Sequence, residues 1–218
     1  MHKIINNLIE IKKEIYSKNI NNNQNPKIIA VSKTFSMNDI MPLIDYGHID
    51  FGENKVQEAI DKWTNVKSIN DNVKLHMIGK LQTNKVKQSV GLFDYIHSVD
   101  SIKLAEKIYK EQKKINKSVK LFIQINLGEE DQKNGIKIKD FPNLYLKCKN
   151  DLKLDVIGIM CIPPVNKDSS FFFQEMKKIA IKFSINEISM GMSSDYLKAI
   201  EHNSSFVRIG SKIFGERS

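Results

Sequence analysis

A lysine at the end of a short apolar segment is the first residue whose chemistry stands out. Residues 28–31 are apolar throughout, and Lys33 follows them after a single serine. Burying an ammonium in such surroundings is costly unless it is paired or neutralised. Lys33 therefore either emerges into solvent where a strand ends, or stays half-buried with a lowered pKa and is ready to form a Schiff base. The segment alone favours the solvent-facing interpretation.

Two segments rich in glycine and serine near the C-terminus suggest phosphate binding. One runs from residue 189 to 195 and contains Ser193, and the other covers residues 208–211 with Gly210 and Ser211. Each follows an apolar segment and precedes a helical pattern, where free N–H groups beside serine hydroxyls form an anion site. Either segment alone is explained by helix capping or a turn. The two segments together favour a phosphate site if the fold brings them next to each other.

The pattern of apolar residues predicts eight strands that alternate with helices, after an amphipathic helix over residues 3–18. The expected strands cover residues 28–33, 49–52, 73–79, 95–99, 119–127, 154–162, 187–190 and 206–209. Such alternation implies parallel strands joined by right-handed crossovers. Eight units in series predict an α/β fold, a single (β/α)8 TIM barrel domain over residues 1–218. An open doubly wound sheet is the alternative, but no Gly-x-Gly-x-x-Gly follows the first strand.

Several helix boundaries follow from individual residues. Asp39 is expected to cap a helix whose first turn tolerates Pro42 and which stops at Gly47. Asp100 is expected to cap the helix after the fourth strand. The helix after the second strand is expected over residues 53–66.

The composition excludes several classes of protein. The net charge is +9, but the basic residues are spread along the chain and Arg208 and Arg217 are the only arginines, whereas nucleic-acid binders concentrate basic residues and use arginine freely. No segment is apolar for long enough to span a bilayer, and the first residues lack the features of a signal peptide. Cys148 and Cys161 have neither metal-ligand spacing nor a disulfide framework. We expect a cytoplasmic protein.

Closing the barrel would place Lys33 beside the two phosphate-type segments. Ligands bind at the carboxyl ends of barrel strands, with phosphates often held after strands seven and eight, and strand eight neighbours strand one. Arg208 could point into the same mouth or be an ordinary exposed or paired arginine. A reactive lysine beside a phosphate cradle fits pyridoxal 5′-phosphate, whose aldehyde bonds to lysine and whose phosphate needs an anchor.

Five motifs in order along the chain then become recognisable. They are Ala30-Val31-Ser32-Lys33-Thr34, Phe51-Gly52-Glu53-Asn54 with Gln57-Glu58, His76-Met77-Ile78-Gly79 with Leu81-Gln82 and Asn84-Lys85, Ser189-Met190-Gly191-Met192-Ser193, and Arg208-Ile209-Gly210-Ser211 with Phe214-Gly215. Together they resemble the pyridoxal phosphate homeostasis protein family, and the resemblance covers nearly the whole chain.

The resemblance implies a barrel like the N-terminal domain of alanine racemase, with Lys33 as the Schiff-base residue. It also implies a contact between Arg208 and the pyridine nitrogen, and a polar contact from Asn54. The phosphate contacts that it implies come from Ser193, Gly210 and Ser211.

Two departures and two open assignments accompany the resemblance. Lys80 stands where the family often has histidine or another residue, and Ser211 replaces a frequent threonine but keeps the hydroxyl. His76 either lines the pocket or is packed and hydrogen-bonded within the barrel. Lys133 matches a family motif and either accepts the aldehyde transiently or, like most loop lysines, has no such role.

The same residues bear on whether the chain is an enzyme. A guanidinium only donates hydrogen bonds, so Arg208 favours an unprotonated pyridine nitrogen and a poorer electron sink. Racemases of this lineage also take a second base from a further β-domain, for which the chain has no room after its eighth strand. We therefore expect a monomeric cofactor-holding protein without catalytic or metal-binding residues, with PLP-dependent apoenzymes as candidate partners. A racemase-like PLP enzyme and a phosphosugar enzyme using Lys33 are the alternatives.

Overall fold

The computed structural model describes residues 2–18, 25–128, 130 and 134–216. Eight parallel strands close into a barrel, in the order β4-β3-β2-β1-β9-β8-β7-β5 with β4 pairing to β5. The strands are β1 (Lys27–Val31), β2 (Asp50–Glu53), β3 (Lys74–Met77), β4 (Tyr95–Val99), β5 (Lys120–Asn126), β7 (Val156–Met160), β8 (Glu187–Met192) and β9 (Phe206–Ile209). The predicted (β/α)8 barrel with an added N-terminal helix is confirmed.

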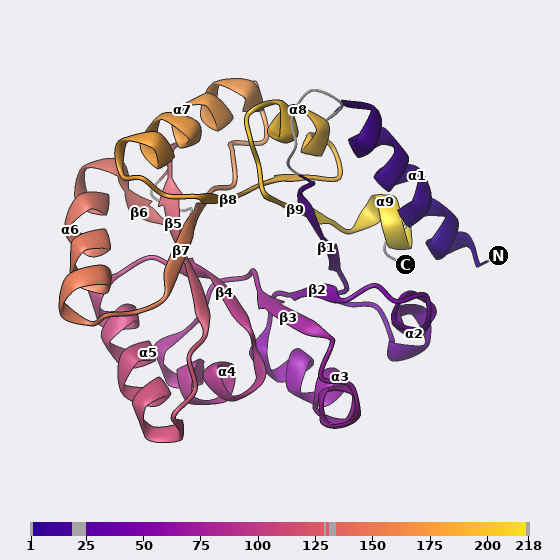
Figure 1. Cartoon of the computed structure of the whole chain (residues 1–218), viewed down its shortest axis with the longest axis horizontal. Helices are drawn as coiled ribbons and strands as arrows, with labels where there is room; N and C mark the ends of the chain where they lie inside the picture. The colour runs from indigo at the N-terminus through magenta and orange to yellow at the C-terminus, as the bar shows by residue number, and fades with distance from the viewer. Residues whose placement is uncertain (1, 19–24, 129, 131–133, 217–218) are drawn as a thin grey trace.

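Helices form an outer ring around the strands (Figure 1). The α-helices are α1 (Lys3–Lys18), α2 (Met37–Asp45), α3 (Val56–Ile69), α4 (Val86–Leu92), α5 (Ile102–Ile115), α6 (Phe141–Leu146), α7 (Ser169–Lys182), α8 (Tyr196–Glu201) and α9 (Ser211–Phe214). Shorter elements are the 3₁₀ turns η1 (Thr83–Lys85) and η2 (Ile138–Asp140), the π-helical turn η3 (Lys147–Asp151) and the two-residue strand β6 (Ile136–Lys137), which pairs with β5.

The first strand illustrates why an apolar sequence becomes a barrel strand. The four residues that follow Lys27 in β1 are all buried, as expected where both faces of a parallel strand are covered. Ile29 faces the barrel interior, whereas Ile28 and Ala30 pack in the larger core under the helices. The apolar interior layer is completed by Tyr95, Phe122, Met160 and Phe206.

The N-terminal helix α1 packs against the last two helices, α8 and α9. α1 packs on α8 and α9 through its buried residues, which include Leu8 and Ile11. Its polar side contributes too, because Asn7 Nδ2 donates to the Ile213 carbonyl at 2.9 Å. The extra helix is therefore part of the packing that supports the C-terminal end of the barrel.

Two predicted helix caps were wrong. α2 begins at Met37 with Ser36 as its N-cap, and Asp39 Oδ2 accepts from the Ser36 N–H at 3.1 Å as the third helical residue of a capping box. Pro42 therefore lies in the second turn. α5 is capped by Ser101, whose Oγ accepts from the Leu104 N–H at 3.3 Å, and Asp100 precedes the cap. In both cases the serine has the extended backbone conformation of an N-cap, whereas Asp39 lies inside its helix and Asp100 precedes the cap.

Other boundaries shift because strands extend further than their apolar residues suggest. Glu53 belongs to the wholly buried strand β2, so α3 begins at Val56 and continues to Ile69. β8 continues to Met192, and α8 begins after Asp195. Gly47, with φ of 89°, ends α2 as predicted.

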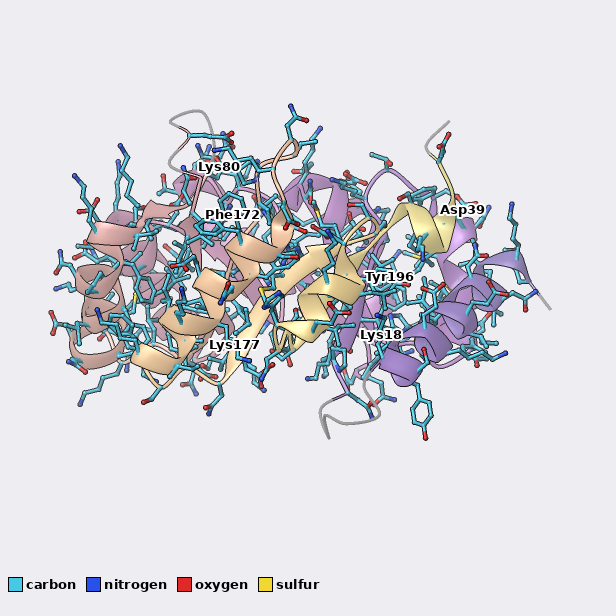
Figure 2. The ribbon with its side chains drawn as sticks, turned by 90° about the horizontal axis from the view of Figure 1, so that it is seen from above. Lys18, Asp39, Lys80, Phe172, Lys177 and Tyr196 are labelled. Carbon is cyan, nitrogen blue, oxygen red and sulfur yellow. The ribbon has the colours of Figure 1, made fainter. Side chains whose placement is uncertain are left out.

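The barrel has two ends with different residues. Lys80 and Asp39, which follow the carboxyl ends of β3 and β1, lie toward one edge, and Lys18 and Lys177 lie toward the other (Figure 2). None of the helices in the described ranges is both long and apolar enough to cross a membrane.

Candidate functional site

A hollow of about 470 Å³ opens at the carboxyl ends of the strands. All six residues predicted for the site line it, and they come from β9 and from the segments that follow β1, β2, β8 and β9. These residues are Lys33, Asn54, Ser193, Arg208, Gly210 and Ser211. The fold thus brings together residues that are up to 178 positions apart in the sequence, as the strand order of a barrel requires.

Lys33 stands in a tight turn directly after β1 and is half-buried. The Phe35 N–H donates to the Ser32 carbonyl at 3.2 Å, and Thr34 has a left-handed φ of 70°. A non-glycine residue at positive φ is uncommon and persists only where the surroundings hold it. The turn that carries Lys33 is therefore held in one backbone conformation by its surroundings.

A partly buried ionic cluster holds the backbone of this turn. Lys62 Nζ, from α3, donates to the carbonyls of Ser32 at 2.9 Å and Phe35 at 3.3 Å. The same ammonium pairs with Glu53 at 2.7 Å and Glu58 at 3.0 Å. Lys62 therefore binds the carbonyls on both sides of Lys33 while two carboxylates balance its charge.

The two carboxylates of this cluster contact the turn directly as well. Glu53 is wholly buried and accepts from Ser32 Oγ at 2.7 Å, and Glu58 accepts from the Thr34 N–H. Burial would raise the pKa of the Glu58 carboxyl, but hydrogen bonds from Thr34 and Lys62 lower it. Sequence reasoning missed this cluster, although Glu53 and Glu58 stand within one of the quoted motifs.

Arg208 is buried and directed into the same hollow. Its Nη1 donates to Ser189 Oγ at 2.8 Å and its Nη2 to the Cys161 carbonyl at 2.9 Å, with only 4% of the residue exposed. Burial lowers the pKa of the guanidinium, against the opposing effects of Cys161 and Asp195. The sequence left open whether Arg208 points into the mouth of the barrel or is an exposed or paired arginine, and its burial excludes the exposed alternative.

The two phosphate-type segments meet at Ser193. Its Oγ accepts from the backbone N–H groups of Gly210 at 3.2 Å and Lys212 at 3.4 Å. The approach depends on Gly191, which has φ of 89° and where a Cβ would lie 2.6 Å from the Ala199 Cβ. Backbone donors and a serine hydroxyl thus gather at the start of α9, the donor set that binds phosphate oxygens.

Asn54 reaches the hollow because the segments after β2 and β3 pack closely. A Cβ at Gly79 would lie 2.3 Å from the Asn54 carbonyl oxygen, so only glycine allows this approach. On the far side, Gln124 Nε2 donates to the Asn134 carbonyl at 3.2 Å, and both residues line the hollow. Neither residue was assigned to the site from the sequence, although Gln124 interrupts an apolar strand.

The two open assignments have different outcomes. His76 is wholly buried inside the barrel, stacks on Tyr95 with ring centroids 4.2 Å apart, and is absent from the described lining of the hollow. His76 is therefore packed within the barrel, and it does not line the pocket as the other alternative would have it. Lys133 lies outside the described residues.

Comparison with known proteins gives consistent matches over the whole chain. The family described as "Alanine racemase, N-terminal domain" matches residues 4–218. The pyridoxal phosphate homeostasis protein of Haemophilus influenzae is 35% identical and covers 97% of this chain and 94% of its own length. That of Escherichia coli K12 is 31% identical and covers 100% and 98%.

Solved structures give the same picture. PipY of Synechococcus elongatus with PLP bound has a TM-score of 0.87 and 29% identity, over 97% of this chain and 100% of PipY. Alanine racemase of Corynebacterium glutamicum, at 14% identity, shares the fold with a TM-score of 0.72, and this chain spans 60% of it.

Proposed function

Because this chain belongs to the pyridoxal phosphate homeostasis proteins, within the alanine racemase N-terminal domain family, we propose that it binds pyridoxal 5′-phosphate in the hollow at the carboxyl ends of the strands. The observation that carries the proposal is the meeting of three kinds of group in one hollow: a lysine, a buried arginine and a cluster of serine and backbone donors. PLP has one complementary feature for each: an aldehyde, a ring nitrogen and a phosphate.

Lys33 is the residue that holds the aldehyde. Its amine would hold the aldehyde of bound PLP as a Schiff base, with loss of one water. The turn that presents Lys33 is fixed by Lys62, Glu53 and Glu58, so little conformational freedom is lost when the bond forms.

The other predicted residues bind and orient the cofactor. Ser193, Gly210 and Ser211 take the phosphate, for which the N–H groups that now meet at the Ser193 hydroxyl are suited donors. Arg208 would donate to the pyridine nitrogen, and Asn54 would supply a further polar contact from the wall of the hollow. When bound, PLP would supply a reactive aldehyde and an electron-withdrawing ring.

We propose that the protein holds and supplies PLP without turnover. Arg208 keeps its protons and donates to neutral oxygens of Ser189 and Cys161, which supports an unprotonated pyridine nitrogen and a weak electron sink. We further propose a single domain over residues 1–218 that acts in the cytoplasm as a monomer, with PLP-dependent apoenzymes as partners. The names of the relatives support the homeostatic role.

One experiment tests the site directly. The protein is mixed with PLP, its absorption spectrum is recorded, the Schiff base is reduced with borohydride, and the labelled peptide is mapped. We expect label on Lys33 and none in the Lys33→Ala variant, while Lys80→Ala, which alters another lysine of the same hollow, keeps it. Label on Lys133, Lys80 or any other lysine instead would overturn the assignment.

A second measurement tests the absence of turnover. The PLP-loaded protein is incubated with a panel of amino acids in deuterated water, and loss of the α-proton is followed by NMR. We expect rates no higher than those of free PLP. Stereospecific exchange well above that level would establish the racemase-like alternative, and trapping of a sugar phosphate by borohydride in protein without PLP would establish an aldolase-type enzyme.

A further inference from the structure

A continuous chain of polar side chains crosses the inside of the barrel, under the proposed cofactor site. Arg208 Nη1 lies 2.8 Å from Ser189 Oγ, which lies 2.9 Å from His97 Nδ1. His97 Nε2 lies 3.0 Å from His76 Nδ1, and His76 Nε2 lies 2.9 Å from Asp50 Oδ1. These residues come from β9, β8, β4, β3 and β2, so the chain runs across the barrel.

The two ends of this chain open on opposite faces of the molecule. Arg208 lines the hollow at the carboxyl ends of the strands. Asp50 is the first residue of β2 and lines a separate hollow with Lys12 and Gly47, at the amino ends of the strands. The members between them are wholly buried.

For neutral histidines, the chemistry of the Asp50 end fixes the direction of every hydrogen bond. A guanidinium can only donate and a carboxylate can only accept. A neutral His76 that donates through Nε2 to Asp50 accepts at Nδ1 from His97 Nε2. His97 then accepts at Nδ1 from the Ser189 hydroxyl, which itself accepts from Arg208. In this arrangement each histidine carries its proton on Nε2.

The charges around the two rings support this neutral state. Burial is the main cause that lowers the pKa of His76, against the opposing attraction of Asp50, and it lowers the pKa of His97 well below its usual range. The charged and titratable groups that face the pair are Asp50, Asp94, Lys27, Arg208 and the histidines themselves. His48 and Lys27 also face Asp50.

We propose that this chain positions Arg208 for the cofactor, with Asp50, His76, His97 and Ser189 as remote positioning residues. Each member turns its acceptor toward Arg208 and its donor toward Asp50, so the dipoles align and strengthen one another. The negative charge of Asp50 thereby stabilises a guanidinium that donates to neutral oxygens of Ser189 and Cys161. The effect on the cofactor rests on the proposed function, whereas the chain itself does not.

The direction of the chain is tested first in the full-length protein without PLP. Two-bond ¹H–¹⁵N spectra of the histidine rings distinguish the Nε2–H form, the Nδ1–H form and the doubly protonated form. Single replacements of His2, His48 and His202 by glutamine assign the remaining two rings. We expect the Nε2–H form for both His76 and His97 at pH 7.5. A proton on Nδ1 of either ring, or a doubly protonated ring, overturns the proposal.

The effect on the cofactor is tested with PLP labelled with ¹⁵N at its ring nitrogen. Asp50→Asn keeps the shape and an acceptor oxygen but removes the charge, and Ser189→Ala cuts the chain next to Arg208. We expect both to shift the ring-nitrogen resonance and to raise the Kd for PLP by about threefold to tenfold, in the range of coupling through packed networks. Asp94→Asn is the matched control, because Asp94 faces His76 but accepts from Lys67 and the Leu75 N–H. It should leave the resonance unchanged.

The double variant tests whether the chain acts as one unit. Once Ser189→Ala has cut the chain, Asp50→Asn should change the ring-nitrogen resonance no further, whereas independent sites would give additive shifts. If the wild-type protein takes up no PLP, the proposed function fails. The histidine-ring spectra still show whether the hydrogen bonds run in the proposed direction. If PLP binds on Lys33 but neither variant shifts the resonance, or the shifts add, the positioning role fails alone.

Discussion

The two ends of the barrel each carry a hollow with lysines in its wall, and the hollows differ in how their residues are used. The hollow at the carboxyl ends measures about 470 Å³, and one beside α5 at the other end measures about 510 Å³. In the first, the segments after β1 and β8 and the strand β9 bring Lys33, Ser193 and Arg208 together. The second is lined by α5 and by the segments that follow α5 and precede β7.

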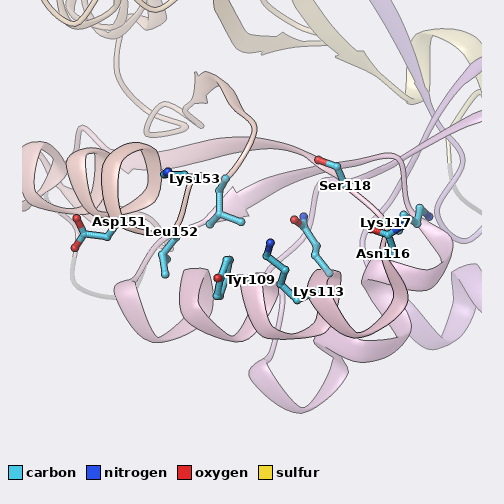
Figure 3. Close-up of a pocket in the computed structure, with 10 residues that line it drawn as sticks. Tyr109, Lys113, Asn116, Lys117, Ser118, Asp151, Leu152 and Lys153 are labelled. Carbon is cyan, nitrogen blue, oxygen red and sulfur yellow. The ribbon is translucent and has the colours of Figure 1, made fainter.

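The side chains of the second hollow do not converge. Asp151 and Lys117 lie at opposite ends of it (Figure 3). Lys117 Nζ donates to the carbonyls of Gly91 at 2.9 Å and Phe93 at 3.1 Å, so it holds the fold together, and Lys113 lies over the ring of Tyr109. Volume and lysines therefore do not make a site. Convergence of groups with complementary chemistry does.

Lys33→Ala and Lys113→Ala break the comparison most directly. Lys33→Ala should abolish the Schiff-base absorption band, because no other amine is expected to hold the aldehyde. Lys113→Ala, in the larger hollow, should leave the band and the Kd for PLP unchanged. Absorption spectra during titration with PLP measure both. A band that survives in Lys33→Ala and disappears in Lys113→Ala would reverse the roles of the two hollows.

Lys62→Met tests the support of the turn that carries Lys33. Loss of the ammonium leaves Glu53, which is wholly buried, without its charge partner, so we expect a loss of about 3 kcal/mol in the free energy of unfolding. Slower Schiff-base formation should accompany it, because the carbonyls of Ser32 and Phe35 lose their common donor. Urea unfolding and stopped-flow absorption measure the two effects.

Lys67→Met is the control for this prediction. Lys67 stands on the same helix and pairs with Asp94 at 2.7 Å, toward the other end of the barrel. The variant should lower the stability while leaving the rate of Schiff-base formation unchanged. Equal slowing in both variants would mean that general loosening of α3, and not the turn, sets the rate.

The end opposite the proposed site is expected to make the fold sensitive to acid. Burial lowers the pKa of His48 from 6.5 to about 4, so below pH 6.5 the unfolded chain binds a proton that the native state does not. Stability should therefore fall as the pH drops from 6.5 toward 4, by about 2 kcal/mol for His48 between pH 7 and 5. Urea unfolding at the two pH values measures the loss.

His48→Gln separates this contribution from the others. The variant should lose about 2 kcal/mol less than the wild type over the same interval, while His76 and His97, whose pKa values are also lowered by burial, retain theirs. A pH dependence identical to that of the wild type would show that His48 is not buried in its neutral form.

The fold and the meeting of the site residues could be predicted from the sequence, whereas their supports could not. Alternating apolar segments fix the number and order of the strands, and barrel closure makes β1 and β9 neighbours, which brings Lys33 to Arg208. Glu53 was predicted to begin a helix, whereas it ends the wholly buried strand β2, where a carboxylate is costly. Only the structure reveals Lys62, Ser32 and Trp63 as the partners that offset this cost.

The interior chain of polar residues could not be predicted from the sequence for a related reason. His76 and His97 alternate with apolar residues in strands, a pattern that equally suits a pocket lining and a packed interior. Their partners Asp50 and Ser189 are 26 and 92 positions away, and their distances depend on how the strands are staggered in the closed barrel. Spacing along the chain carries no information on that stagger.

Ser193→Ala and Ser118→Ala give the smallest and finest comparison of the two hollows. Ser193 has a hydroxyl at the meeting point of the N–H groups of Gly210 and Lys212, and a hydrogen bond to a phosphate contributes about 1.5 kcal/mol, so its loss should raise the Kd for PLP roughly tenfold. Ser118 lines the hollow beside α5 and should have no effect. The Lys33 band should persist in both variants, because the Schiff base does not depend on the phosphate contact. If Ser193→Ala leaves the Kd unchanged, the phosphate is held by other donors and the segments after β8 and β9 meet for packing alone.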